Sequence, residues 1–249
     1  MRPISCAWHV YSFDKQVFLS NLIGESGWVF DLPLGILTFS NQFRWQTQLL
    51  GTESETSGIW LWAWANTESN IPAHMLVASL VLKAYGEQHG IPELTTPQVP
   101  LDQINGHTLA LLASGICEAN AYYRCPYNGG ALFVLIMDEN FPKCPDPPLQ
   151  RIATVFPQAI ASLDIPDHNL ALTGYLDHYG LSYERDDDKI VVKEMGEAVL
   201  TATFDELGRL TNLEVKLKTE GDGLAEELPT ENPPGESWDE AQLRRMMGG

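Results

Sequence analysis

Apolar and polar residues alternate with a period of two over much of the first half of the chain. The segments that show this pattern are residues 28–32, 36–39 and 43–51. Residues 58–66 keep the period of two, but there indoles alternate with small aliphatic side chains, so both faces are apolar. Because successive side chains of a strand point to opposite faces, the pattern predicts four strands. Turn-forming residues such as Pro33, Gly35 and Asn41 separate the first three, and short connections predict an antiparallel meander.

Helical spacing of apolar residues replaces this alternation elsewhere in the first half. It predicts helices at residues 14–23, 73–88 and 106–119, the second of them with Pro72 before its start and Gly90 after its end. Two further strands, residues 121–125 and 131–138, flank a tight-turn sequence that includes Asn128 and Gly129. They predict a hairpin.

A cluster of prolines at positions 142, 145, 147 and 148 then marks an internal boundary. Beyond it the sequence predicts two helices, residues 149–163 and 169–178, and four short strands between residues 182 and 217. We therefore expect an α+β protein in which antiparallel meanders pack against helices. The expected parts are residues 1–141, 142–218 and an acidic, disordered tail at 219–249. Since a helix precedes a meander in both parts, two similar halves are an alternative.

The segment around residues 59–66 places Trp60, Trp62 and Trp64 on alternate positions. In one continuous strand the three indoles would share a face, either as core or as a groove for a flat or apolar ligand. Asn66, at the end of this strand, would lie near that face. Glu93 and Thr95, which follow the second helix, would complete a ligand or partner surface.

The chain is strongly acidic, with 15 Lys and Arg against 33 Asp and Glu and a formal net charge of −18. Such a charge repels polyanions, so we expect no nucleic-acid partner. The charge could favour a basic protein partner, although solubility is its simpler explanation. The sequence has no apolar run long enough for a membrane span and no N-terminal targeting pattern, which predicts a cytoplasmic protein.

Candidate catalytic chemistry is sparse. The sequence lacks the glycine-rich phosphate loops, metalloprotease helix and serine elbow that mark common enzyme classes. The cysteines are widely spaced and do not match structural zinc sites. We therefore expect no catalytic residue, metal or cofactor. Whether the protein is an enzyme stays open at this point, and a non-catalytic protein is the favoured interpretation.

The last residues carry a second candidate contact. Ser237 and Glu240 form a capping box, and Trp238, Leu243 and Met246 supply apolar side chains after the acidic stretch. A short helix here could dock on a partner.

The tryptophan segment also carries a resemblance. Together with residues 85–95, which read Tyr-Gly-Glu-Gln-His-Gly-Ile-Pro-Glu-Leu-Thr, it resembles an uncharacterised family of bacterial proteins, a domain of unknown function, over residues 28–138. The resemblance implies a bacterial soluble protein and supplies no activity.

Three functions remain compatible with the sequence. The first is a non-catalytic binding protein of the bacterial cytoplasm, such as an immunity-type neutraliser of a basic toxin. The second is a small-molecule-binding protein or enzyme with a pocket lined by the three tryptophans. The third is a structural or scaffold subunit that uses the tail. The oligomeric state does not follow from the sequence.

Overall fold

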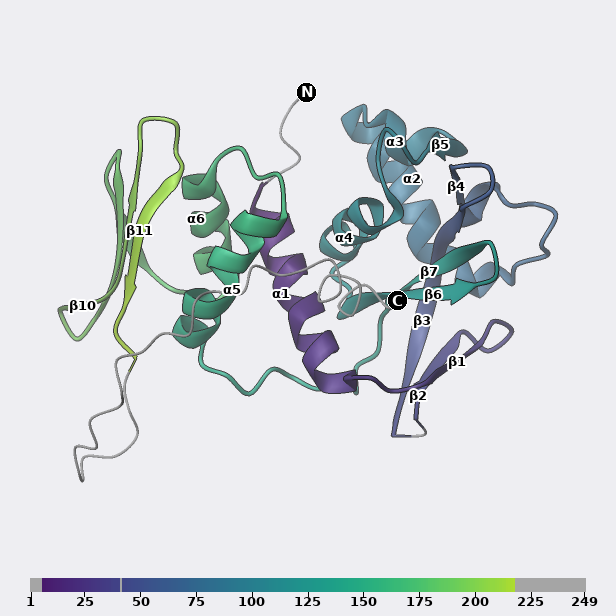
Figure 1. The fold of residues 1–249 in the computed structure, drawn as a ribbon, viewed down its shortest axis with the longest axis horizontal. Coiled ribbons are helices and arrows are strands. Elements are labelled where there is room, and N and C mark those ends of the chain that lie inside the picture. The colour runs from purple at the N-terminus through teal and green to yellow at the C-terminus, as the bar shows by residue number, and fades with distance from the viewer. Residues whose placement is uncertain (1–5, 41, 218–249) are drawn as a thin grey trace. The chain divides into compact units, whose positions relative to one another are not determined.

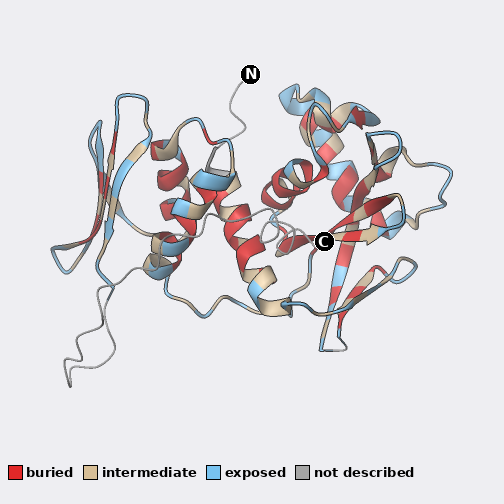
Figure 2. Ribbon diagram, viewed as in Figure 1, coloured by how far each residue is buried: buried red, intermediate tan, exposed pale blue. Residues whose placement is uncertain are grey.

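The computed structural model describes residues 6–40 and 42–217, and Figure 1 labels most of its helices and strands. The described chain divides into two compact units, one comprising Trp8–Pro145 and the other residues 6–7 and 146–217. Both units contain antiparallel strands and helices, which confirms the predicted α+β class. Both also contain buried residues, which are coloured red on the ribbon in Figure 2.

The first unit is built on a sheet. Its strands are β1 (Trp28–Asp31), β2 (Ile36–Phe39), β3 (Phe43–Ser54), β4 (Ile59–Trp62), β5 (Gln98–Pro100), β6 (Ala121–Tyr127) and β7 (Gly130–Ile136). Strands β1 to β5 are neighbours in chain order, while β7 pairs with both β3 and β6. The predicted meander of the first four strands and the predicted β6–β7 hairpin are therefore confirmed. The long β3 organises the sheet, because its first residues pair with β2 and its last residues with β4 and β7.

Large side chains fill the core on this sheet. In β2 the burial alternates along the strand, so that Leu37 and Phe39 face a cluster that includes Trp45 and Tyr123. The rings of Phe39 and Tyr123 lie edge to face with centroids 4.8 Å apart, a favoured aromatic geometry.

Four helices accompany this sheet: α1 (Cys6–Ile23), α2 (Val77–His89), the one-turn α3 (Pro92–Thr95) and α4 (Gly106–Ile116). Helix α2 packs against β3, and α4 packs across β3, β6 and β7. Asn105 caps α4, since its side chain accepts a hydrogen bond of 2.8 Å from the amide of Thr108. Gly90 ends α2 in the left-handed conformation, as the sequence predicts.

Some predicted boundaries in this unit are wrong. The expected strand 58–66 ends at Trp62, and Ala63–Ala65 form a turn of 3-10 helix instead. The partner strand β5 has only three residues, so the ladder stops, and alanine favours helical geometry. Helix α1 starts at Cys6 rather than Asp14. Its first turns lack a clear apolar period, so the sequence pattern did not predict them. The short α3 and β5 were not predicted.

The second unit contains α5 (Pro148–Ser162) and α6 (His168–His178), followed by β8 (Tyr183–Arg185), β9 (Lys189–Glu194), β10 (Glu197–Phe204) and β11 (Leu210–Val215). The four strands form an antiparallel sheet in the order β11-β10-β9-β8, as a meander requires. Asp167 caps α6 by accepting a 2.8 Å hydrogen bond from the amide of Leu170. The carbonyl of Gly208, in the β10–β11 turn, accepts hydrogen bonds from the amides of His168 and Asn169. These contacts hold the start of α6 against that turn.

Among residues 6–40 and 42–217, none of the helices is both long enough and apolar enough to cross a membrane. The predicted tail, residues 219–249, lies outside the described residues.

Candidate binding site

Trp60 and Trp62 belong to the core of the first unit. Both side chains are 0% exposed, and their rings lie edge to face with centroids 5.3 Å apart. The indole nitrogen of Trp62 donates a 2.9 Å hydrogen bond to the carbonyl oxygen of Glu93. Gly51 lies against the Trp60 ring, where an added Cβ would come within 2.7 Å of indole carbon Cζ2. A ligand therefore has no access to these two indoles in this conformation.

The other residues of the predicted tryptophan surface contact neighbouring side chains or the backbone of their own turns. Trp64 follows the end of the strand, and the Lys83 ammonium lies 4.5 Å from its ring centroid. The Asn66 side chain accepts a hydrogen bond from the amide of Ser69, and the Thr95 hydroxyl donates one to the carbonyl of Pro92. Of the six residues predicted for this surface, the structure thus joins Trp62 directly to Glu93, whereas Asn66 and Thr95 stabilise their own turns.

A partly buried ion pair lies on the sheet face beneath α4. Arg124 Nε and Glu53 Oε1 are 2.7 Å apart, and their side chains are 16% and 13% exposed. A second carboxylate, that of Glu55, lies 3.4 Å from Arg124 Nη2 but is 64% exposed. The other oxygen of Glu53 faces Gly106, the first residue of α4. A negative charge at this position is favoured by the helix dipole, so the pair positions the start of α4 on the sheet.

His107, the next residue of α4, contacts the same face. Its Nδ1 lies 3.2 Å from the hydroxyl of Tyr122, and its ring packs edge-on against Phe133. Burial, together with the nearby positive charge of Arg124, lowers the pKa of His107 from 6.5 to about 4. The imidazole is therefore neutral near pH 7 and serves as a packed hydrogen-bonding group.

This low pKa predicts a stability change in acid. Below pH 6.5 the unfolded chain binds a proton at His107 that the folded chain excludes until pH falls to about 4. Stability should therefore decline as pH drops through this window, by up to about 3 kcal/mol from this group. Urea unfolding at pH 7, 5.5 and 4.5 measures the decline. His107→Asn, which keeps a polar group near the Tyr122 hydroxyl, should show a shallower slope; an unchanged slope would contradict the assignment.

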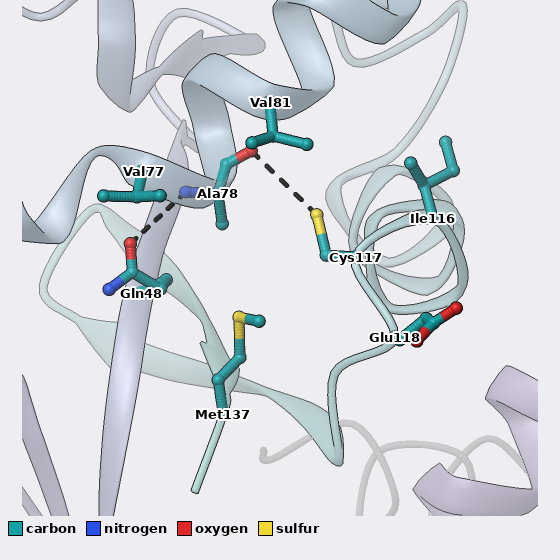
Figure 3. A pocket seen from close by; sticks show the side chains of 8 residues that line it. All are labelled: Gln48, Val77, Ala78, Val81, Ile116, Cys117, Glu118 and Met137. Atoms are coloured by element: carbon teal, nitrogen blue, oxygen red, sulfur yellow. Dashed lines mark hydrogen bonds between the residues drawn. The ribbon is translucent and has the colours of Figure 1, made fainter.

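An apolar cleft of about 420 Å³ opens between α2 and α4 in the first unit. Figure 3 shows its lining residues: Gln48, Val77, Ala78, Val81, Ile116, Cys117, Glu118 and Met137. Val77 and Val81 lie one turn apart on α2, Ile116 comes from the end of α4, and Met137 directly follows β7. The volume is within the range of ligand-binding clefts, and the lining has the usual apolar character with a few polar groups.

The apolar wall of this cleft is accessible. Val77 is 55% exposed, Val81 49% and Met137 38%. Single exposed apolar residues are common on protein surfaces, but neighbouring ones around a cavity indicate a contact surface.

The polar groups of the cleft are held in place by hydrogen bonds. The Gln48 amide donates to the carbonyl of His74 at 2.9 Å and accepts from the amide of Ala78 at 3.3 Å, which ties β3 to the start of α2. The Cys117 thiol points to the carbonyl of Ala78, as the dashed line in Figure 3 marks. Burial raises the pKa of this thiol to about 11, so it stays protonated and is a poor nucleophile.

Glu118 stands at the rim in an unusual backbone conformation. Its φ of 51° is in the left-handed region, where glycine is favoured at the end of a helix. The amide of Ala119 donates to the carbonyl of Ser114 across this position, which closes the end of α4. The left-handed backbone conformation costs a glutamate about 1 kcal/mol relative to glycine. The glutamate places a carboxylate beside the apolar cleft.

Sequence reasoning missed this cleft, although one signal was present. The predicted core face of α2 includes Ala78, Ser79 and Leu82, which are buried. Val77 and Val81 lie off that face, and with Leu80 they leave apolar side chains without a place in the core. Such surplus apolar residues on a helix were the available indication of a second surface.

Residues 7–139 match the model of a family of unknown function, DUF6882. The chain belongs to the DUF6882 family. Neither a curated protein nor a solved structure was found to match the chain. The DUF6882 region begins before the predicted resemblance and includes nearly all of α1. It also contains every residue of the cleft, from Gln48 to Met137. The tail candidates Trp238, Leu243 and Met246 lie beyond this region and outside the described residues.

Proposed function

We propose that this DUF6882 protein is a non-catalytic binding protein that holds a basic partner through an apolar anchor in the cleft between α2 and α4. The observation that carries the proposal is the cleft itself, in which Val77, Val81 and Met137 stay exposed around a cavity of about 420 Å³. A cavity of this size accommodates a few apolar side chains, as in complexes in which an amphipathic helix occupies a groove.

Electrostatics support a basic partner. Glu118 lines the cleft, and Asp138 and Glu139 follow Met137 directly. With a net charge of −18, the protein attracts cationic surfaces and accelerates their association at low ionic strength. An immunity-type neutraliser of a basic toxin is the most concrete form of this function. Free thiols at Cys117 and Cys125 are consistent with a reducing compartment such as the bacterial cytoplasm.

A small apolar molecule is the second candidate occupant. The cleft volume of about 420 Å³ favours it as well, because drug-sized ligands use cavities of this order. Such a ligand would bind through Val81 and Ile116 and would not depend on salt. Salt dependence therefore separates the two candidates.

The experiment uses two synthetic helical peptides, a leucine–lysine peptide with leucines at helical spacing and a serine–lysine peptide of equal charge. We expect the full chain to bind the first peptide more tightly, as measured by fluorescence anisotropy at low salt. Val81→Glu should weaken this binding at least about tenfold, since it places a charge in the apolar wall. Raising the salt concentration should weaken the binding further.

Leu80→Glu is the matched control, because Leu80 is 50% exposed on the same helix but does not line the cleft. This change should alter the affinity for the leucine–lysine peptide less than about twofold, because a single charge at the edge of an interface has a small effect on affinity. Equal loss in both variants, or equal affinity for both peptides, would contradict an apolar anchor in the cleft.

A further inference from the structure

We propose that the second unit binds a linear aliphatic polyamine, of the spermidine class, in an acidic cavity at one end of its sheet. The cavity has a volume of about 670 Å³. It is lined by the β8–β9 turn, the β10–β11 turn and the start of α6. All its lining residues fall between positions 167 and 208, so this site is independent of the cleft in the first unit.

Negative charge dominates the lining of this cavity. Arg185 is its one positive side chain, whereas five side chains are carboxylates: Asp167, Asp187, Asp188, Asp205 and Glu206. Asp167 also caps α6, and its charge offsets the positive end of the helix dipole. The neighbouring His168 is neutral near pH 7, because burial and the charge of Arg209 lower its pKa from 6.5. A cavity with this balance of charge attracts cations.

A buried amide supplies a hydrogen-bond acceptor in the same cavity. Asn169 lines the cavity although it is only 4% exposed, and its side-chain carbonyl oxygen has no hydrogen-bond partner among the described residues. Buried polar groups of folded proteins are nearly always paired. The oxygen therefore calls for an N–H or O–H donor from outside the chain. An ammonium group answers both features, since it donates hydrogen bonds and carries positive charge.

The distribution of the carboxylates favours an extended cation over a single metal ion. Asp187 and Asp188 follow β8, Asp205 and Glu206 follow β10, and Asp167 precedes α6. In the part of the chain that the structure describes, these groups do not form a set of three that could hold one metal ion. The ammonium groups of a linear polyamine are separated by short methylene chains, so each can meet a different carboxylate.

An apolar side chain completes the match to a polyamine. Phe204, at the end of β10, lines the cavity and is 5% exposed. The methylene chains between ammonium groups can pack on such a surface while the charged groups reach the carboxylates. A compact inorganic cation gains nothing from this contact.

Two of the carboxylates can be neutralised without disturbing the fold. Asp187 and Asp188 are exposed in the β8–β9 turn. Asp205 is less suitable, because its Oδ1 accepts hydrogen bonds from the amides of Leu207 and Arg209 and so holds the β10–β11 turn. The double variant Asp187→Asn and Asp188→Asn is therefore the first test of the cavity.

Isothermal titration calorimetry of the full chain with spermidine at low ionic strength measures the binding. We expect saturable binding that weakens as salt is added. The Asp187→Asn and Asp188→Asn pair should weaken it about tenfold, since two ion-pairing groups are lost. Glu197→Gln with Glu214→Gln is the matched control: it removes the same charge from exposed positions of this unit outside the cavity. The control should change the affinity less than about twofold. Equal losses in the two pairs, or no saturable binding, would overturn the inference.

Variants of Asn169 test the buried acceptor. Asn169→Leu removes the side-chain oxygen and should weaken spermidine binding about tenfold. Asn169→Asp keeps an acceptor at this position and should retain the affinity. Circular dichroism checks that each variant is folded, and the aspartate pair decides if either is not. Unchanged affinity in a folded Asn169→Leu variant would contradict a site built on this amide.

Two competitors identify the class of the ligand. Mg²⁺ at equal total charge should not displace spermidine, because it cannot span the separated carboxylates. A trilysine peptide should also compete poorly, since its peptide carbonyls would be desolvated among carboxylates that donate no hydrogen bonds. Displacement of spermidine by Mg²⁺ would assign the cavity to a metal ion, and displacement by trilysine would assign it to a basic protein. Either result would overturn the polyamine assignment.

Discussion

Replacing Trp62 with leucine is expected to lower the free energy of unfolding by about 3–4 kcal/mol. The indole is fully buried, so a smaller side chain removes contacts and leaves a cavity. The change also removes the 2.9 Å hydrogen bond to Glu93, which leaves a carbonyl without its donor. Urea unfolding followed by circular dichroism measures the loss.

Trp64→Leu is the matched control for this prediction. Trp64 lies two residues further along, is only partly buried, and its indole nitrogen has no hydrogen-bond partner in the structure. Its replacement should cost about 1 kcal/mol. Similar losses at both positions would show that Trp62 is not the core residue that the structure places there. Unchanged stability in Trp62→Leu would contradict the packing of β4 directly.

Replacing Arg124 with methionine is expected to give the second large loss in the free energy of unfolding. It leaves the Glu53 carboxylate, 13% exposed, without its 2.7 Å partner beneath α4. Removing one partner of a buried ion pair costs about 3–5 kcal/mol, and the residual exposure of this pair places the expected loss near 2–3 kcal/mol. Chemical denaturation of the single variant measures it. Arg44→Met, at an exposed position of β3, should change stability by less than about 0.5 kcal/mol.

A double variant tests whether the unpaired carboxylate of Glu53 causes this loss of stability. Adding Glu53→Gln to Arg124→Met replaces the unpaired charge with a neutral amide, so we expect about 1 kcal/mol of the loss to return. Additive losses in the double variant would mean that the two side chains stabilise the fold independently. In that case the ion pair would not position α4.

Regular parts of the fold were predictable because local patterns determine them. The strand at Ile36–Phe39 has the predicted bounds, since alternating burial follows from a single buried face. The hairpin of β6 and β7 follows from its turn sequence. The end of β4 at Trp62 was not predictable, because it depends on how far the distant β5 extends. A periodic sequence continues past the point where the partner strand stops.

The candidate site was harder to predict from the sequence than the fold was. Trp60 and Trp62 form an alternating apolar pattern whether they are core or surface, and only the packing of Phe133 and Gly51 against Trp60 decides it. The cleft combines residues from β3, α2, α4 and the end of β7. Residues so far apart in sequence have no shared motif, so tertiary structure is needed to bring Val81 and Met137 to one cavity.

The central claim is that the cleft between α2 and α4 is the binding surface. Methyl NMR of the full chain labelled at the methionine methyl groups tests it most directly, with the leucine–lysine peptide as titrant. Met137 lines the cleft, whereas Met195 is fully exposed at a turn of the second unit and reports non-specific contact. We predict that the Met137 methyl signal shifts progressively and saturates while that of Met195 stays in place. A shift of Met195 alone, or of neither signal, would contradict the claim.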